Sequence, residues 1–156
     1  MPQAQAGEQK VFKTPSITTD AIVTKAKAEG GYEILLVTRG RPPFVGSYAF
    51  PGGFVDYGED PEVGVLRELQ EECNVEGRAP ELICVAGKPD RDPRKHVISI
   101  VYSVVVDPAA QVSAGDDAAT AHWYDLQTVW NEFELAFDHK DILHQFLQKK
   151  HPAVLG

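Results

Sequence analysis

The chain has 156 residues, of which 43% are hydrophobic and 24% charged, values typical of one globular domain with a single core. A formal net charge of -8 disfavours nucleic acid as a partner, because the phosphate backbone is also negative. Neither a membrane-spanning apolar run, nor a secretory signal, nor a cysteine framework is present, so we expect a reduced, cytoplasmic protein without a membrane partner.

The first part of the chain predicts a tail followed by two strands. Residues 1–10 are polar and lack periodicity, which indicates a flexible N-terminal tail or arm. Residues 11–156 are then expected to form one domain. Residues 17–24 and 32–38 are rich in β-branched and aliphatic side chains and are separated by a turn at Gly30 and Gly31, so they are expected to be neighbouring strands.

A loop and a helix follow. Residues 39–60 are dense in glycine, proline and aromatic residues, a composition that favours a structured, functional loop. Over residues 61–73, apolar side chains recur every three or four positions, at Val63, Leu66, Leu69 and Cys73. Asp60 suits the cap and Pro61 the first helical position, so an amphipathic helix is predicted here.

The second half predicts more strands and a closing helix. Strands are expected at residues 81–86, 96–106 and, briefly, 122–124, with loops at residues 87–95 and 113–121. Residues 138–149 carry four apolar residues on one face, which predicts the last helix. Strands flanked by two helices indicate an α/β sandwich.

The helix over residues 61–73 presents three carboxylates together. At about 100° per residue, Glu68, Glu71 and Glu72 share one face, opposite the apolar side chains. A solvated acidic face is the ordinary explanation of such a cluster. The alternative is a site for Mg²⁺, which prefers oxygen ligands, keeps several waters and is often shared with substrate phosphates.

These residues lie in a longer pattern. Every fixed residue of the Nudix box except its final glycine has a counterpart at the same spacing: Gly53, Glu59, Arg67, Glu68, Glu71 and Glu72. The final glycine is replaced by Asn74, which tolerates the left-handed conformation that commonly ends a helix. The chain therefore resembles the Nudix hydrolase family, which implies a Nudix-type α/β/α sandwich with a mixed sheet.

The resemblance implies roles for individual residues. Glu68, Glu71 and Glu72 are expected to bind Mg²⁺, with Mn²⁺ as the alternative ion, and Gly53 is expected to add its carbonyl oxygen. Arg67 and Glu59 are expected to orient these carboxylates. Glu59 also suits the start of a helix, where the dipole favours an acid, and Gly53 also suits an ordinary turn.

The family hydrolyses nucleoside diphosphates linked to another group. The segments at residues 88–102, 114–117 and 136–143 resemble its ADP-ribose pyrophosphatase branch, which implies cleavage to AMP and ribose 5-phosphate. Arginines in loops are expected to bind the substrate, and Phe44 or Tyr48 to stack on adenine, although core packing also accounts for both aromatics. The arginines concerned are Arg39, Arg41, Arg91 and Arg94.

The general base and the exact activity stay open at this point. Asp116 and Asp117 lie in a loop that resembles the position of the base in related enzymes, and we favour Asp117, with Glu71 as the next candidate. A triphosphate-cleaving enzyme and a catalytically silent regulator are the alternative functions. The three glutamates and Arg67 favour an enzyme over the regulator, and the resemblance also implies a homodimer.

Overall fold

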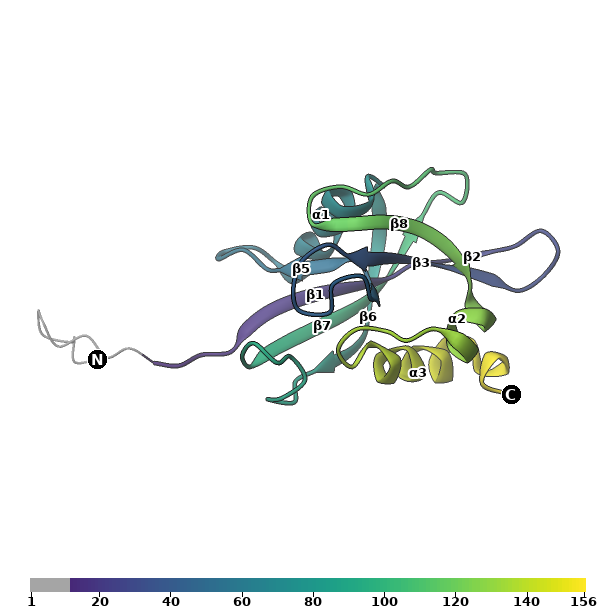
Figure 1. The fold of residues 1–156 in the computed structure, drawn as a ribbon. Helices are drawn as coiled ribbons and strands as arrows, with labels where there is room; N and C mark the ends of the chain where they lie inside the picture. Colours follow the sequence, from purple (N-terminus) through teal and green to yellow (C-terminus); the bar gives the residue numbers. More distant parts are fainter. Residues whose placement is uncertain (1–11) are drawn as a thin grey trace, which may run out of the picture.

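The computed structural model describes residues 12–156, so the tail predicted for residues 1–10 lies outside the described part of the chain. Two four-stranded sheets form the middle of the molecule, with α1 (Pro61–Cys73) on one side and α3 (His139–Lys150) on the other (Figure 1). The predicted α/β/α sandwich is confirmed. No helix within residues 12–156 is long and apolar enough to span a membrane.

The first sheet is mixed, as predicted. Its strand order is β5 (Gly52–Phe54), β1 (Ser16–Ile22), β7 (Val97–Val106) and β6 (Gly77–Ala86). β1 pairs in parallel with β7, whereas β5 and β6 pair antiparallel with their neighbours. This order brings the glycine-rich β5 beside β1 at the edge of the sheet, next to the helix that carries the glutamates.

The second sheet is antiparallel. β3 (Tyr32–Arg39) pairs with β2 (Thr24–Ala26), β4 (Tyr48–Ala49) and β8 (Ala118–Asp125). The single strand predicted over residues 17–24 is wrong, because the chain passes between the sheets at the buried Val23. Alternation along β3 then sends side chains to both sides of the sandwich.

Two apolar clusters hold the layers together. Leu35 of β3 lies in one cluster with Val65 and Leu69 of α1. The adjacent Ile34 lies in the other cluster with Ile142 and Leu143 of α3. Successive β3 residues therefore bury opposite faces of the sheet, under α1 on one side and α3 on the other.

The predicted helix α1 is confirmed at both ends. The Asp60 carboxylate accepts a hydrogen bond of 2.9 Å from the Glu62 N–H, and Asn74 closes the helix at a φ of 53°. One side chain was placed wrongly, because Val63 is 58% exposed. The buried stripe instead follows Val65, Leu69 and Cys73, which are spaced one turn apart along the axis.

A third helix, α2 (Leu126–Glu132), was not predicted. It has only seven residues, too few to show a helical period, and begins where the Asp125 carboxylate accepts a hydrogen bond from the Thr128 N–H. The strand before it, β8, is longer than the predicted residues 122–124 and absorbs the end of the predicted loop at residues 113–121. After α3 the chain ends in a short helix, η1 (Pro152–Leu155).

We predict that Leu69→Ala lowers the free energy of unfolding by about 3 kcal/mol, because it leaves a cavity under α1. Val63→Ala on the same helix is the matched control and should cost less than about 0.5 kcal/mol, since this side chain is already exposed. Urea unfolding measures both values. Equal losses in the two variants would contradict the assigned buried face.

Candidate active site

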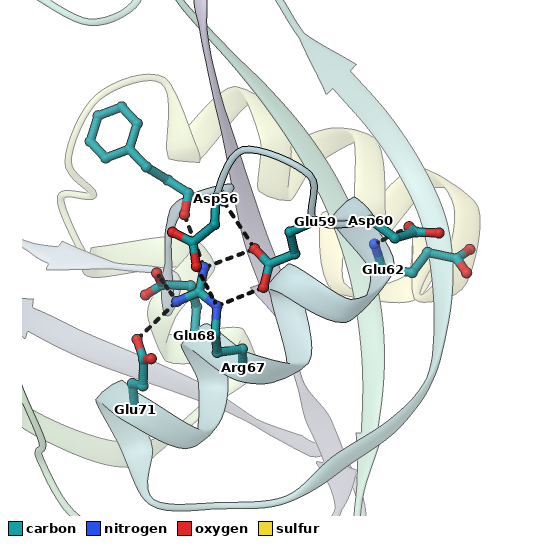
Figure 2. A network of polar contacts seen from close by, with 8 residues as sticks. Asp56, Glu59, Asp60, Glu62, Arg67, Glu68 and Glu71 are labelled. Carbon is teal, nitrogen blue, oxygen red and sulfur yellow. Dashed lines mark hydrogen bonds and ion pairs between the residues drawn. The ribbon is translucent and has the colours of Figure 1, made fainter.

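Arg67 organises the acidic side of α1 (Figure 2). Its Nε and Nη2 atoms donate to the two carboxylate oxygens of Glu59, at 2.7 and 3.0 Å. Nη1 donates to Glu68 at 2.9 Å and to Glu71 at 3.0 Å. Nη2 also donates to the Phe54 carbonyl at 3.1 Å, which ties the end of β5 to the helix. One guanidinium thus fixes three carboxylates and a backbone oxygen.

The pKa values of Glu59 and Glu68 shift in opposite directions. Hydrogen bonds from Arg67 and from the Asp56 N–H lower the pKa of Glu59 to about 2, so it stays ionised. Burial raises the pKa of Glu68, although Arg67 opposes that change. Arg67 and Glu59 therefore form an ionic pair, and the same guanidinium contacts Glu68 and Glu71.

Glu72 points away from Arg67 and toward β5. Its carboxylate accepts a hydrogen bond of 3.2 Å from the Gly52 N–H. Burial raises its pKa to about 8, and the negative charges of Glu68, Asp20 and Asp117 add to this effect. Arg67 holds Glu68 and Arg41 holds Asp117, whereas no ion pair within residues 12–156 neutralises Glu72, and a buried carboxyl group in this situation favours binding of a positive ion.

Gly53 lies directly against Glu68. A Cβ atom at this position would come within 2.5 Å of the Glu68 carboxyl group, so a larger residue would push the carboxylate or the strand aside. Gly53 thus leaves the Glu68 carboxyl group in the position where Arg67 holds it, and its backbone lies beside the acidic face.

A cleft of about 490 Å³ opens over these residues, a volume suited to a nucleotide-sized ligand. Of the residues predicted for the site, the cleft is lined by Arg39, Arg41, Gly53, Glu68, Glu72, Arg91, Arg94 and Asp117. Four other predicted residues do not line the cleft, namely Phe44, Glu59, Arg67 and Glu71.

The oxygen donors at this cleft fit a hard divalent ion with water in its remaining positions. Within residues 12–156, no group of three or more His, Cys, Asp or Glu side chains is already gathered into a metal site. Glu68 and Glu71 do not gather around a common point with Glu72, because Arg67 holds both of them. Ligation by all three glutamates would therefore require the ion to compete with Arg67.

The four predicted arginines all line the cleft, but they differ in burial and in the partners that they contact. Arg91 is 4% exposed and forms a bidentate ion pair with Asp138, at 2.9 and 2.7 Å. Arg94 pairs with Asp92 at 2.7 Å and lies over the ring of Phe54. These two arginines therefore build the wall of the cleft through their own acidic partners.

The other two arginines, Arg39 and Arg41, make fewer hydrogen bonds within the protein. Arg39 donates its Nε to the Pro43 carbonyl at 2.6 Å and lies 4.9 Å from the Phe137 ring centre. Arg41 is 73% exposed and contacts Asp117 at 3.0 Å. Their guanidinium groups keep more donors for a ligand than that of Arg91 does.

The two predicted stacking aromatics also differ. Phe44 is 43% exposed and meets Phe137 edge to face at 4.9 Å. Tyr48 packs in the core beside Tyr124 and Phe133. Core packing thus accounts for Tyr48, whereas Phe44 retains an exposed face.

The sequence analysis missed a buried polar chain at the cleft. The Ser99 hydroxyl donates to the Asp20 carboxylate, and His139 Nε2 lies 3.8 Å from the same oxygen. Nδ1 of His139 accepts the Phe50 N–H at 3.2 Å, and burial lowers the pKa of this imidazole, so the neutral ring fixes the chain just before β5. In the sequence, the only indication of this group was Asp20, an acidic residue inside the predicted apolar strand over residues 17–24.

Comparison with known proteins agrees with this geometry. The NUDIX domain model matches residues 15–146. A curated ADP-ribose pyrophosphatase from Methanocaldococcus jannaschii is 40% identical over 141 residues, which cover 90% of this chain and 78% of that protein. The chain belongs to the Nudix family.

Other relatives include a Nudix family protein, an NrtR domain and a transcriptional repressor. A MutT/nudix family protein from Enterococcus faecalis has a TM-score of 0.83 at 29% identity, covering 97% of this chain and 71% of its own. The NUDIX domain of Shewanella oneidensis NrtR, crystallised with ADP ribose, has a TM-score of 0.81 at 29% identity, covering 88% and 90%. An ADPR responsive transcriptional repressor from Acinetobacter baylyi is 28% identical over 86% of this chain and 54% of its own.

We predict that Arg91→Met lowers the free energy of unfolding by about 3 kcal/mol, because the partly buried Asp138 carboxylate loses its bidentate partner. Arg41→Met, at an exposed arginine of the same cleft, should change it by less than about 0.5 kcal/mol. Chemical denaturation compares the two. A stable Arg91→Met protein would show that the ion pair is not what holds this wall.

Proposed function

We propose that this Nudix protein hydrolyses ADP-ribose to AMP and ribose 5-phosphate in a metal-dependent reaction. The observation that carries the proposal is the cleft itself, in which Glu68 and Glu72 of the box helix lie across from arginine-bearing loops. The 40% identical relative, an ADP-ribose pyrophosphatase, supports the choice of substrate.

The metal in this proposal is Mg²⁺, with Mn²⁺ as the alternative. Glu68, Glu71, Glu72 and the Gly53 carbonyl would hold it, while Glu59 keeps Arg67 in place behind them. When bound, the metal supplies the positive charge that lets a diphosphate approach an acidic protein and lowers the pKa of the attacking water. The reaction breaks one P–O bond of the diphosphate as water adds to phosphorus.

Asp117 is the proposed general base. Its carboxylate lies at the cleft, close enough to Glu72 to influence its pKa, and contacts Arg41. A carboxylate here would take the proton of the attacking water. Glu71 is the alternative base, but its carboxylate is held by Arg67 in the absence of substrate.

Substrate binding is assigned to the loops around the cleft. Arg39 and Arg41 would contact the diphosphate. Phe44 lies outside the lining of the cleft but packs against Phe137, which lines it, and would stack on an adenine that extends beyond the cleft. Arg91 and Arg94 would shape the pocket for the terminal ribose through the acidic partners that hold them. Recognition at both ends of the ligand favours ADP-ribose over a triphosphate, whose charge is concentrated at one end.

The regulator remains a second candidate, because two of the relatives are an ADP-ribose-responsive repressor and an NrtR domain solved with ADP ribose. A regulator would bind the ligand without consuming it. The Arg67 network and Glu72 favour the enzyme, since binding alone requires no such grouping of carboxylates.

Assembly and location also belong to the proposal. A homodimer is supported by two exposed apolar residues of β6, Leu82 and Val85, which pair with Tyr102 and Ile100 of β7 and so share one face of the sheet. A cytoplasmic location is supported by the two unpaired cysteines in residues 12–156.

The substrate assignment predicts a higher kcat/KM for ADP-ribose than for ATP, dGTP or oxidised dGTP at the same Mg²⁺ concentration and pH. Mass spectrometry of the products should detect AMP and ribose 5-phosphate. Faster release of pyrophosphate from a triphosphate would favour the triphosphate-cleaving alternative, and ADP-ribose bound but unchanged would favour the regulator.

Glu72→Gln should lower kcat by about 100-fold or more, because it removes an anionic ligand needed to hold the metal. Folding should persist and the unfolding temperature should not fall, since glutamine has the size of Glu72 and the neutral form that burial favours there, and its side-chain oxygen can still accept the Gly52 N–H. Steady-state kinetics at saturating Mg²⁺ and a thermal scan test both statements. Normal turnover would remove Glu72 from the metal site.

Asp117→Asn should lower kcat by about 100-fold with little change in KM, because an amide cannot take a proton from water. Asp116→Asn is the matched control, since it changes the adjacent carboxylate of the same loop, and should stay within about threefold of the wild type. Equal kcat values for all three proteins would transfer the role of base to Glu71.

A further inference from the structure

Asn74 occupies the one position at which the box departs from the family pattern. Its φ of 53° is left-handed, and its N–H donates to the Gln70 carbonyl at 2.9 Å to end α1. Glycine would make the same backbone bond at lower conformational cost. The backbone therefore does not explain why asparagine stands here.

The Asn74 side chain makes contacts that glycine could not make. Its Nδ2 donates to both the carbonyl and the hydroxyl oxygen of Ser113, each at 3.0 Å. These bonds join the end of the glutamate-bearing helix to a loop 39 residues further along the chain.

Backbone hydrogen bonds also join this loop to the end of α1. The last carbonyls of a helix have no partner inside it. Here Cys73 accepts the Ser113 N–H at 3.0 Å, and Glu72 accepts the Gly115 N–H at 2.9 Å. Gly115 lies so close to the helix that a Cβ atom would be 2.2 Å from the Glu71 carbonyl oxygen. The loop is thus seated directly on the end of the helix that carries the proposed metal ligands.

The attached loop leads to Asp117. After a left-handed Asp116, at a φ of 41°, the Asp117 carbonyl accepts the Gly40 N–H at 3.1 Å, and its side chain reaches the cleft. One end of the loop is therefore fixed to α1 and the other to the end of β3. Asn74 supplies the side-chain part of the first attachment.

We propose that Asn74 is a positioning residue that holds the loop over residues 113–117 on the end of α1 and so sets the place of the Asp117 carboxylate relative to Glu72. The catalytic consequence rests on the proposed function, in which Asp117 is the general base. The attachment itself does not depend on that function.

Asn74→Gly tests the proposal, because glycine keeps the left-handed helix end and removes only the side-chain bonds. Amide hydrogen exchange at Ser113, Gly115 and Ala118 should become about fivefold faster, the effect expected from losing one net hydrogen bond. With ADP-ribose, kcat should fall by about fivefold while KM stays nearly constant. Glu76→Gln, an exposed neighbour on the same segment, is the control and should change neither quantity.

A double-mutant cycle with Asp117→Asn separates positioning from a general loss of structure. The kcat effect of Asn74→Gly should nearly disappear in the Asp117→Asn background, because the loop then has no base to position. A loss of the same size in both backgrounds would overturn the proposal, as would unchanged exchange or unchanged kcat in the single variant.

Failure of the proposed function is distinguishable from failure of this inference. If the wild-type protein does not hydrolyse ADP-ribose, the proposed reaction is wrong. The exchange comparison needs no substrate, so faster exchange in Asn74→Gly would still support the attachment and unchanged exchange would still overturn it.

Discussion

Crowding of negative charge at one end of α1 is the constraint on which the rest of the site depends. Arg67 offsets part of it by holding Glu59, Glu68 and Glu71 at once. Glu72 faces the cleft without such a partner, and burial together with nearby carboxylates raises its pKa to about 8. The protein thus neutralises Glu59, Glu68 and Glu71 through Arg67 and leaves Glu72, in the cleft, for an external cation.

The same helix can carry this charge because its other face is bound to the core. Val65 and Leu69 pack against the sheets, and Gly53 lets β5 approach the acidic face closely. On the opposite wall, Asp138 holds Arg91 while the neighbouring His139 holds the Phe50 backbone. Rigid elements therefore define both sides of the cleft, which is what precise positioning of a substrate requires.

Much of this arrangement could be predicted from the sequence, and what could not has physical causes. The helix over residues 61–73 was predicted to the residue because its cap, period and box coincide. Helix α2 is too short to show a period. The partner of Arg91 was invisible because it depends on a tertiary contact, with Asp138 lying 47 residues away. Asn74 was recognised as a departure, but its bonds to Ser113 depend on the folded loop.

The central claim is that the cleft accepts a diphosphate only together with a divalent cation. Calorimetric titration with a non-hydrolysable methylene analogue of ADP-ribose, in Mg²⁺ and in chelator, tests it most directly. We expect strong binding with Mg²⁺ and at least about tenfold weaker binding in chelator, because no cation then links the carboxyl groups of Glu68 and Glu72 to the diphosphate. Equal affinity under the two conditions would contradict it.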